Sequence, residues 1–260
     1  MSYSTSAGVA TITLDHLGSR NAISRALLGD IGDGMARAVA DPSVRVVVLT
    51  HTGPAFCAGA DLDAGGVDRA VAHSRGRAST EAGIYDMAAV LDAIMDSPKP
   101  VVARIAGLCA GGGVGLAAAA DVSIAAEGAH FVLSEVRLGM APAIISVVCL
   151  PKLRRGDALE LFLTGERIGA TRAAAVGLIS RAVPPADLDA SVDTIVQSLI
   201  AGAPGALGAA KSLVYDVPGM ERADAFAATI RLTASLSVGE EARAGMAAFT
   251  RGETPPWVPQ

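Results

Sequence analysis

The sequence is poor in the residues that build disulfides and metal centres. It has 260 residues but only three cysteines and four histidines. Cys57, Cys109 and Cys149 show no CxxC spacing, and the histidines are dispersed along the chain. Widely spaced cysteines in an odd number argue against a disulfide framework, and no cluster has the spacing of metal ligands. We therefore expect no metal ion, and a reducing, cytoplasmic environment.

Long apolar runs and concentrated charge are also absent. No segment reaches the ~20 consecutive apolar residues that a membrane helix requires. Residues 1–10 lack the basic start and apolar run of a signal peptide. The formal net charge is −5, and the basic residues are scattered, without the patch that binds nucleic acid. These absences predict a soluble, unprocessed protein with neither a nucleic acid nor a membrane as its partner.

What the sequence does contain is a large apolar fraction arranged in an α/β pattern. Apolar residues make up 51% of the chain, enough for one large domain or a domain with a helical annex. Short, mostly β-branched runs predict strands, and apolar residues at helical spacing predict helices. The predicted strands are 9–14, 44–50, 100–105 and 122–126, and the predicted helices are 25–40 and 80–96. Because the pattern beyond Pro142 is mostly helical, we expect an α/β core over residues 1–195 and a helical region over 196–260.

Two of the predicted strands end in glycine-rich loops. The first loop runs from Gly53 to Asp61 and the second from Gly107 to Gly115. In the second, Gly111 to Gly113 stand directly before a short apolar helix, and the unpaired N–H groups at a helix start attract negative charge. One N–H from each loop, converging on a single oxygen, would form an oxyanion hole. Either glycine run alone is more typical of a tight turn.

A nicotinamide or flavin site is a competing interpretation, because residues 113–118 fit the G-x-G-x-x-G/A fingerprint after a strand. The next strand follows too soon, however, since a parallel crossover needs ~10–12 residues and the acidic partner of the fingerprint stands ~20 residues on. The chain also has no Walker-type phosphate loop and no G-x-S-x-G elbow. These absences disfavour an ATP-dependent ligase and a serine thioesterase.

The motifs resemble those of the crotonase superfamily, also called the enoyl-CoA hydratase/isomerase family, along essentially the whole chain. The matching segments are Arg20-Asn21-Ala22-Ile23-Ser24, Phe56 to Leu62, Ala110 to Gly113, Ala117 to Asp121, Ser134 to Gly139 with Pro142, Leu163 to Ile168, Ala173-Ala174 and Gly177-Leu178. The resemblance implies a spiral of β-β-α turns followed by a C-terminal helical region that packs partly on a neighbour. It also implies a homotrimer or a dimer of trimers, and an acyl-CoA substrate with no further cofactor.

The resemblance assigns roles to individual residues. Ala60 and Gly112 would supply the two oxyanion N–H groups, and Glu135 would be the acid/base. Such donors matter because thioester α-protons are acidic only when the enolate oxygen is stabilised. The remaining residues expected along the substrate and CoA channel are Ala22, Ala58, Asp61, Leu62, Gly111 and Gly115.

One position departs from the pattern of typical hydratases of this family, which carry two glutamates. The first falls at Gly115, so Glu135 is the single acid/base. A single carboxylate can hydrate a 2-enoyl-CoA or move a double bond between C3 and C2. Segments around Gly115 and Glu135 resemble bacterial hydratases of methylglutaconyl-CoA, which favours hydration and suggests that a substrate carboxylate takes the place of the missing one. A non-catalytic acyl-CoA-binding protein is the alternative of another class.

Overall fold

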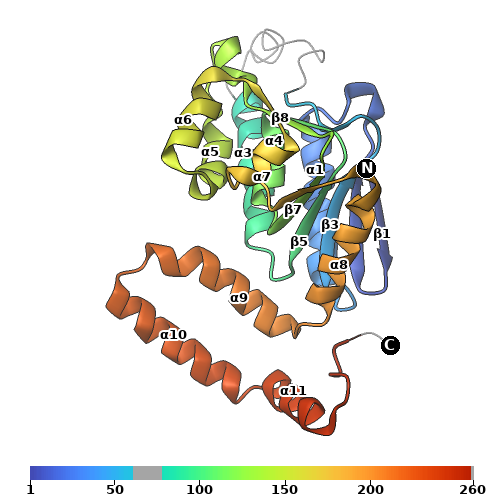
Figure 1. Ribbon diagram of the computed structural model, residues 1–260, viewed down its shortest axis with the longest axis vertical. Coiled ribbons are helices and arrows are strands. Elements are labelled where there is room, and N and C mark those ends of the chain that lie inside the picture. Colours follow the sequence, from blue (N-terminus) through green and yellow to red (C-terminus); the bar gives the residue numbers. More distant parts are fainter. Residues whose placement is uncertain (61–77, 259–260) are drawn as a thin grey trace.

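Two β-sheets organise the chain in the computed structural model, which describes residues 1–60 and 78–258 (Figure 1). One sheet has six strands in the order β1-β2-β3-β5-β7-β10, and the other has four in the order β4-β6-β8-β9. Pairing is parallel except for β1 with β2 and β8 with β9. The strands are β1 Ser2–Ser6, β2 Val9–Leu14, β3 Val46–His51, β4 Ala55–Cys57, β5 Val101–Ile105, β6 Leu108–Ala110, β7 Val122–Ala126, β8 His130–Val132, β9 Arg167–Gly169 and β10 Arg181–Val183.

The central part of the chain repeats a β-β-α turn. The first strand of each turn (β3, β5, β7) joins the six-stranded sheet, and the second (β4, β6, β8) joins the four-stranded one. Helix α3, Ala78–Met95, follows β4, and helix α4, Gly112–Ala119, follows β6. The α/β class and the expected spiral are therefore confirmed.

Strand β3 shows why the six-stranded sheet is buried on both sides. All six of its residues are buried, and successive side chains of a strand point to opposite faces. Val47 and Leu49 join the main core, together with residues of α1, α3 and α4. Val46 and Val48 instead join a second core, where they pack with one side of α8, Leu188–Ile200. A continuous apolar run is what such a doubly covered strand requires.

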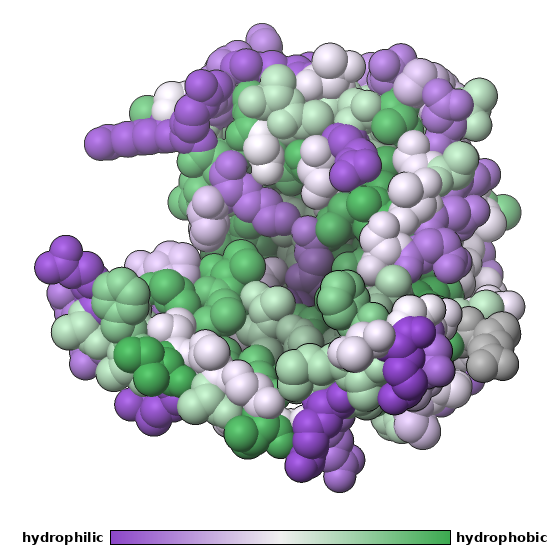
Figure 2. Space-filling model, turned by 60° about the horizontal axis from the view of Figure 1, so that its bottom comes forward, coloured by the Kyte–Doolittle hydropathy of each residue, from purple (hydrophilic) through white to green (hydrophobic). Residues whose placement is uncertain are grey.

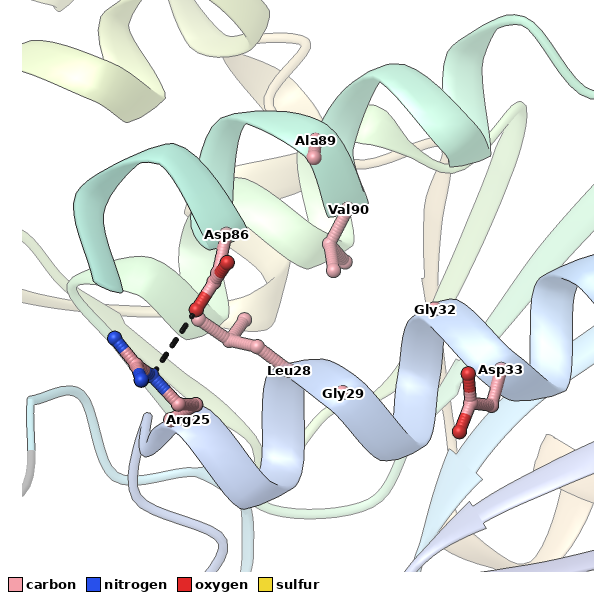
Figure 3. A pocket seen from close by; sticks show the side chains of 8 residues that line it. All are labelled: Arg25, Leu28, Gly29, Gly32, Asp33, Asp86, Ala89 and Val90. Carbon is pink, nitrogen blue, oxygen red and sulfur yellow. Dashed lines mark ion pairs between the residues drawn. The ribbon is translucent and has the colours of Figure 1, made fainter. Parts of the chain in front are cut away.

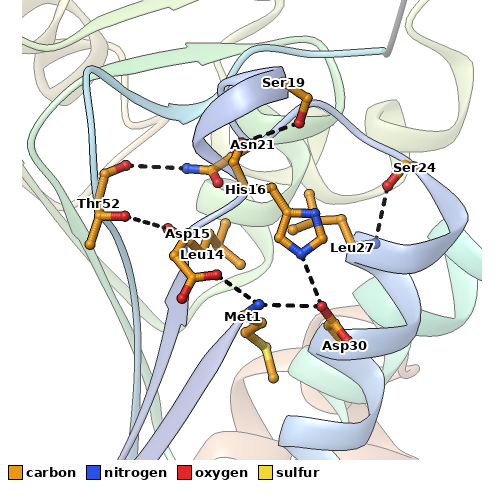
Figure 4. A network of polar contacts seen from close by, with 10 residues as sticks. All are labelled: Met1, Leu14, Asp15, His16, Ser19, Asn21, Ser24, Leu27, Asp30 and Thr52. Carbon is orange, nitrogen blue, oxygen red and sulfur yellow. Dashed lines mark hydrogen bonds and ion pairs between the residues drawn. The ribbon is translucent and has the colours of Figure 1, made fainter. Parts of the chain in front are cut away.

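Helix α1, Arg25–Ala40, begins and ends where the sequence predicts. Its N-cap Ser24 has extended backbone and accepts a hydrogen bond from the Leu27 N–H at 3.2 Å (Figure 4). The other helices are α5 Ala143–Cys149, α6 Arg155–Thr164, α7 Ala170–Ala175, α9 Pro204–Asp216, α10 Arg222–Ser237 and α11 Glu240–Arg251, with short 3-10 turns at Leu17–Ser19, Ser134–Leu138, Leu150–Lys152, Pro185–Asp187 and Val217–Gly219. None of the described helices combines the length and apolar character needed to cross a bilayer.

Helices α9 to α11 form an arm that extends away from the α/β body, and the chain end then returns toward α8 (Figure 1). The return is fixed by Arg45, whose guanidinium donates to the backbone oxygens of Gly202, at 2.6 Å, and Trp257. The expected division at 195/196 falls inside α8, whose buried residues up to Ile200 all lie in the second core. A C-terminal region with its own role stays a prediction, and its arm begins at α9.

Six strands lie where no strand was expected: β1, β4, β6, β8, β9 and β10. β4, β6 and β8 are three residues long, and the first two fall in the segments expected to be glycine-rich loops. β1 has mostly exposed residues, so it lacks an apolar signal. β9 and β10 are three residues long and interrupt a stretch that was predicted to be mostly helical. They form because the edges of two sheets are available for pairing, with β8 and β7 respectively, a tertiary effect that no local pattern reveals.

Candidate active site

Three neighbouring parallel strands of the smaller sheet end at the same edge and carry the expected catalytic groups. β4 pairs with β6 and β6 pairs with β8, and the carboxyl ends of parallel strands meet along one edge. Ala60 follows β4, Gly112 follows β6, and Glu135 follows β8. The loops are in contact, since a Cβ added to Gly111 would lie 3.0 Å from Glu135 Oε1 and 3.7 Å from the Gly59 Cα.

The first loop, residues 58–60, is held from the side by the segment before α1. The Ala58 N–H donates to the Arg20 oxygen at 3.2 Å, and the Ile23 N–H donates to the Gly59 oxygen at 2.7 Å. The buried Asn21 side chain donates from Nδ2 to the oxygens of Ala55, at 2.9 Å, and Thr52, at 3.4 Å (Figure 4). The backbone of Ala58 and Gly59 is thus hydrogen-bonded to the segment that precedes α1.

The second loop turns sharply into helix α4. Gly111 has φ +48°, a left-handed conformation that glycine adopts without strain, and its N–H donates to the Val132 oxygen at 2.9 Å. Gly112 is the first residue of α4. Neither its N–H nor that of Ala60 donates to another residue in the described part of the chain. Both groups remain available to an external oxygen, as the proposed hole requires.

Glu135 is the carboxylate of this site and lies in the 3-10 turn Ser134–Leu138. Its Oε2 is buried without a hydrogen-bond partner, and it forms no ion pair with any residue that the structure describes. Burial raises the pKa of the Glu135 carboxyl above its ordinary value, because desolvation disfavours the charged form. An unpaired carboxylate with raised basicity can accept a proton from a substrate or a water molecule.

The position of the missing first glutamate is filled by an aliphatic side chain. Gly115 is buried on α4, and a Cβ added there would lie 3.0 Å from the Ile145 Cβ, closer still to the Ile145 Cγ2, and 3.5 Å from the Met87 Cε. Ile145 and Met87 are 4% and 5% exposed. The space next to the Gly115 Cα is therefore taken by Ile145 of α5. The expectation that a substrate carboxylate takes the place of the missing one stays a prediction.

The remaining site residues have mixed outcomes. Ala22 is buried beside the first loop and Ala58 is half-buried within it. Asp61 and Leu62 lie outside the described residues. Ile23, Met87 and Ile145 were missed as neighbours of the second loop, because a lone aliphatic residue in a helical or loop segment carries no signal of what it faces.

The thiols and the histidine near the loops have structural roles. Burial raises the pKa of Cys57 to about 12, and that of Cys109 well above its usual value, so neither is a thiolate at neutral pH. His51 Nε2 accepts the Ala106 N–H at 2.9 Å, which leaves the proton on Nδ1 facing the Thr52 oxygen. Burial lowers its pKa, so neutral His51 ties β3 to β5. The described residues include no cluster of metal-ligating side chains.

Two other hollows lie away from the catalytic groups. One of about 500 Å³ is lined by residues of α1 and α3, among them Arg25 and Asp86, which form an ion pair at 3.5 Å (Figure 3). Another, of about 620 Å³, lies between the body and α9 and contains the Asp121–Lys211 ion pair, 3.0 Å long. Figure 2 brings this end of the molecule forward and shows apolar side chains gathered around a hollow between the arm and the body.

Comparison with known proteins agrees with this arrangement. Residues 4–260 match the sequence profile described as enoyl-CoA hydratase/isomerase. A Rhodobacter capsulatus protein named "Probable enoyl-CoA hydratase" is 33% identical over 97% of this chain and 95% of its own. The carnitinyl-CoA dehydratase of Escherichia coli K12 is 31% identical over 96% and 94%. The crystal structure of a Mycobacterium smegmatis enoyl-CoA hydratase superposes with a TM-score of 0.86 at 31% identity, over 96% and 95% of the two chains.

Proposed function

The chain belongs to the enoyl-CoA hydratase/isomerase family, and we propose that it adds water to a 2-enoyl-CoA thioester, or removes it, with Glu135 as the only acid/base. Coenzyme A is then part of the substrate, and no separate cofactor takes part. The names of two relatives, a hydratase and a dehydratase, support this reaction type in both directions.

The proposed reaction uses one carboxylate twice. Glu135 takes a proton from water as the water oxygen bonds to C3, and the electron pair of the C2=C3 bond moves through C2 onto the thioester oxygen. The N–H groups of Ala60 and Gly112 stabilise this enolate oxygen. Glu135 then returns the proton to C2, which restores the thioester. Its raised pKa suits both steps, because the same group must take a proton and give it back.

The observation that carries the proposal is the convergence of three strand ends. Pairing of β4, β6 and β8 brings to one edge of the sheet two backbone donors and one carboxylate that have no partner among residues 1–60 and 78–258. A merely structural glutamate would have a partner, since a buried polar group without one is costly. A functional role explains why the Glu135 Oε2 has none.

The test compares two glutamine variants on a panel of CoA esters. The purified protein is incubated with crotonyl-CoA, 3-methylglutaconyl-CoA and a 3-enoyl-CoA, with enone absorbance followed and products identified by mass. A gain of one water establishes hydration. Glu135→Gln should then lower kcat by roughly 10²–10⁴-fold while acyl-CoA binding persists. Glu127→Gln, at an exposed carboxylate, is the matched control and should leave kcat unchanged.

Double-bond isomerisation is the second candidate, and the filled position at Gly115 favours it. With Ile145 in place of a second carboxylate, the described site holds no second acid/base near Glu135. Glu135 would take a proton from C2 of a 3-enoyl-CoA and return it to C4. An isobaric 2-enoyl product identifies this reaction. Binding of the esters without any product would instead identify a non-catalytic acyl-CoA-binding protein.

We also propose that the arm mediates assembly into a homotrimer or a dimer of trimers. Several large apolar side chains of α9 to α11 are exposed, among them Val214, Phe226, Ile230, Met246 and Phe249, the last 88% exposed. Monomeric proteins rarely expose so many together. Light scattering should give a trimeric or hexameric mass, which Ile230→Glu should reduce. A monomeric mass for the unaltered protein at micromolar concentration contradicts this proposal.

A further inference from the structure

The short segment Arg20–Ile23 contacts both loops that carry the oxyanion donors. On the first loop, its backbone bonds to Ala58 and Gly59, and Ile23 pairs with Ala60 in an isolated parallel bridge. On the second loop, a Cβ added to Gly112 would lie 2.9 Å from the Ile23 Cγ1 and 3.3 Å from its Cδ1. The Ile23 side chain therefore lies against the Gly112 backbone, while its main chain is bonded to the other loop.

The pairing in the bridge leaves the Ala60 N–H unused. In this parallel bridge Ile23 donates to the oxygen of Gly59, the residue before its partner, so Ala60 itself keeps its N–H for another acceptor. The bridge thus fixes the plane of the peptide that carries this N–H without consuming the donor. Backbone pairing is a rigid way to aim such a group.

The segment itself is held in an uncommon conformation. Arg20 and Asn21 have φ of +54° and +56°, in the left-handed region that residues other than glycine, asparagine and aspartate seldom adopt. Asn21 is fully buried and its amide donates to two oxygens of the chain that leads into β4. Strained backbone persists where the surroundings determine it from several sides, and it gathers at functional sites.

We propose that the left-handed turn at Arg20–Asn21 and the side chain of Ile23 are positioning elements that set the separation and direction of the Ala60 and Gly112 donors. The inference rests on the proposed oxyanion hole. Asn21 anchors the turn to the strand before the first loop, and Ile23 spans from the bridge with Ala60 to the face of Gly112. Neither side chain touches the reacting atoms; each acts through the backbone groups it places.

Oxyanion donors are sensitive to such placement. Their effect depends on pointing at the oxygen as it becomes charged, and a displacement of about 1 Å can lower the rate by about 100-fold. A donor out of place weakens transition-state stabilisation more than ground-state binding, because the thioester oxygen is only weakly charged before the reaction. The expected signature is a lower kcat with nearly unchanged acyl-CoA affinity.

The experiment uses two variants of the segment and one neighbouring control in the full-length protein. Asn21→Gly removes the amide while keeping a residue that tolerates the left-handed backbone. Ile23→Ala removes the side chain against Gly112 and leaves the bridge. Ser24→Ala removes the N-cap of α1, next along the chain, whose side chain bonds to Leu27 and to neither loop. Stability of all three is compared by urea unfolding.

Three readouts distinguish a change in the placement of the two donors from a global loss of stability. They are kcat on the best ester of the panel, affinity for a saturated acyl-CoA, and the absorbance shift of a bound cinnamoyl-CoA ester, which reports polarisation of its carbonyl. Asn21→Gly and Ile23→Ala should each lower kcat by about 10- to 100-fold, reduce the shift, and keep affinity. Ser24→Ala should keep both kcat and the shift.

The outcomes distinguish this inference from the function on which it rests. If the unaltered protein polarises the ester but folded Asn21→Gly and Ile23→Ala retain its full shift and kcat, the positioning role is overturned. The same holds if Ser24→Ala, at equal loss of stability, loses as much activity. Absence of any shift or turnover in the unaltered protein overturns the oxyanion hole itself, and the positioning role with it.

Discussion

The contact between Gly115 and Ile145 leads to a prediction about stability that does not depend on the reaction. A Cβ at position 115 would lie only 3.0 Å from the Ile145 Cβ and nearer to its Cγ2, a separation that requires Ile145 or the helix to move. Overpacking of this kind costs about 1–3 kcal/mol, and replacing glycine in a helix offsets about 1 kcal/mol of it. Gly115→Ala should therefore destabilise the protein by up to about 2 kcal/mol.

Truncation of the other partner, Ile145→Ala, creates a cavity at the same place. Ile145 is 4% exposed, and truncating such a side chain to alanine typically costs about 2–5 kcal/mol. In the double variant, the new methyl group at 115 enters the space that Ile145 leaves. The cost of the double variant should then fall short of the sum of the two single costs by about 0.5–3 kcal/mol, the coupling typical of residues in direct contact.

The assay is urea unfolding of the four proteins of this cycle at one pH, with midpoints and slopes fitted together. A second cycle combines Ile145→Ala with Gly29→Ala, a helical glycine with open space around its Cβ position. That pair should be additive within about 0.5 kcal/mol. Additivity in the Gly115 cycle as well would refute the packing of Ile145 against the position of the missing glutamate.

Three further predictions follow from buried groups. Burial raises the pKa of Glu135 in the folded state above its ordinary value of 4.5. The charged carboxylate therefore lowers the stability of the folded protein above the folded pKa, and this effect vanishes below about pH 4.5. Glu135→Gln should raise the urea midpoint at pH 8, and equal midpoints of the two proteins there would contradict this. Gly113→Ala should destabilise by about 1–3 kcal/mol in urea, since its Cβ would lie 2.6 Å from the Cys57 Cβ. Lys211→Met should cost about 1–3 kcal/mol, because the partly buried Asp121 carboxylate loses its ion-pair partner while still accepting the Val101 N–H. A Lys211→Met/Asp121→Asn double variant that is destabilised as much as Lys211→Met would argue against that cause.

The elements with strong local signals were predicted from sequence, and those made by tertiary pairing were not. Helix α1 carries its own start, a Ser24 cap, and an apolar stripe that includes Leu27, Leu28 and Ile31. Strand β3 carries its signal because both faces are buried. Strand β9 carries none, because its three residues, Arg167–Gly169, owe their conformation to pairing with β8. Local periodicity reports burial, and an edge strand with little burial leaves no trace in it.

Among the site residues, too, those with a local signal were predicted from sequence and those defined by tertiary contacts were not. The glycines of the second loop were visible because their conformations and close contacts exclude side chains, as at Gly111 with φ +48°. Glu135 was visible through the motif around it. Ile145 was invisible because its importance lies in what it packs against, the absent side chain of Gly115. The absence of a motif residue can be recognised from the sequence. Which side chain fills the space next to Gly115 depends on α5, a helix thirty residues further along the chain.

The Glu135 carboxylate has no ion-pair partner among the described residues, and this one feature both lowers the stability of the folded protein at high pH and raises the pKa of the proposed acid/base. A site with two carboxylates can divide the work, one accepting a proton while the other donates, whereas a single carboxylate must do both in one turnover. A partner such as an arginine would lower its pKa and make the carboxylate a poorer base. Burial, with no ion-pair partner among the described residues, raises the pKa instead. In the proposed reaction, the raised pKa favours the protonated form until C2 receives the proton. The pH profile of kcat should therefore shift toward lower pH in any variant that brings a cation to Glu135.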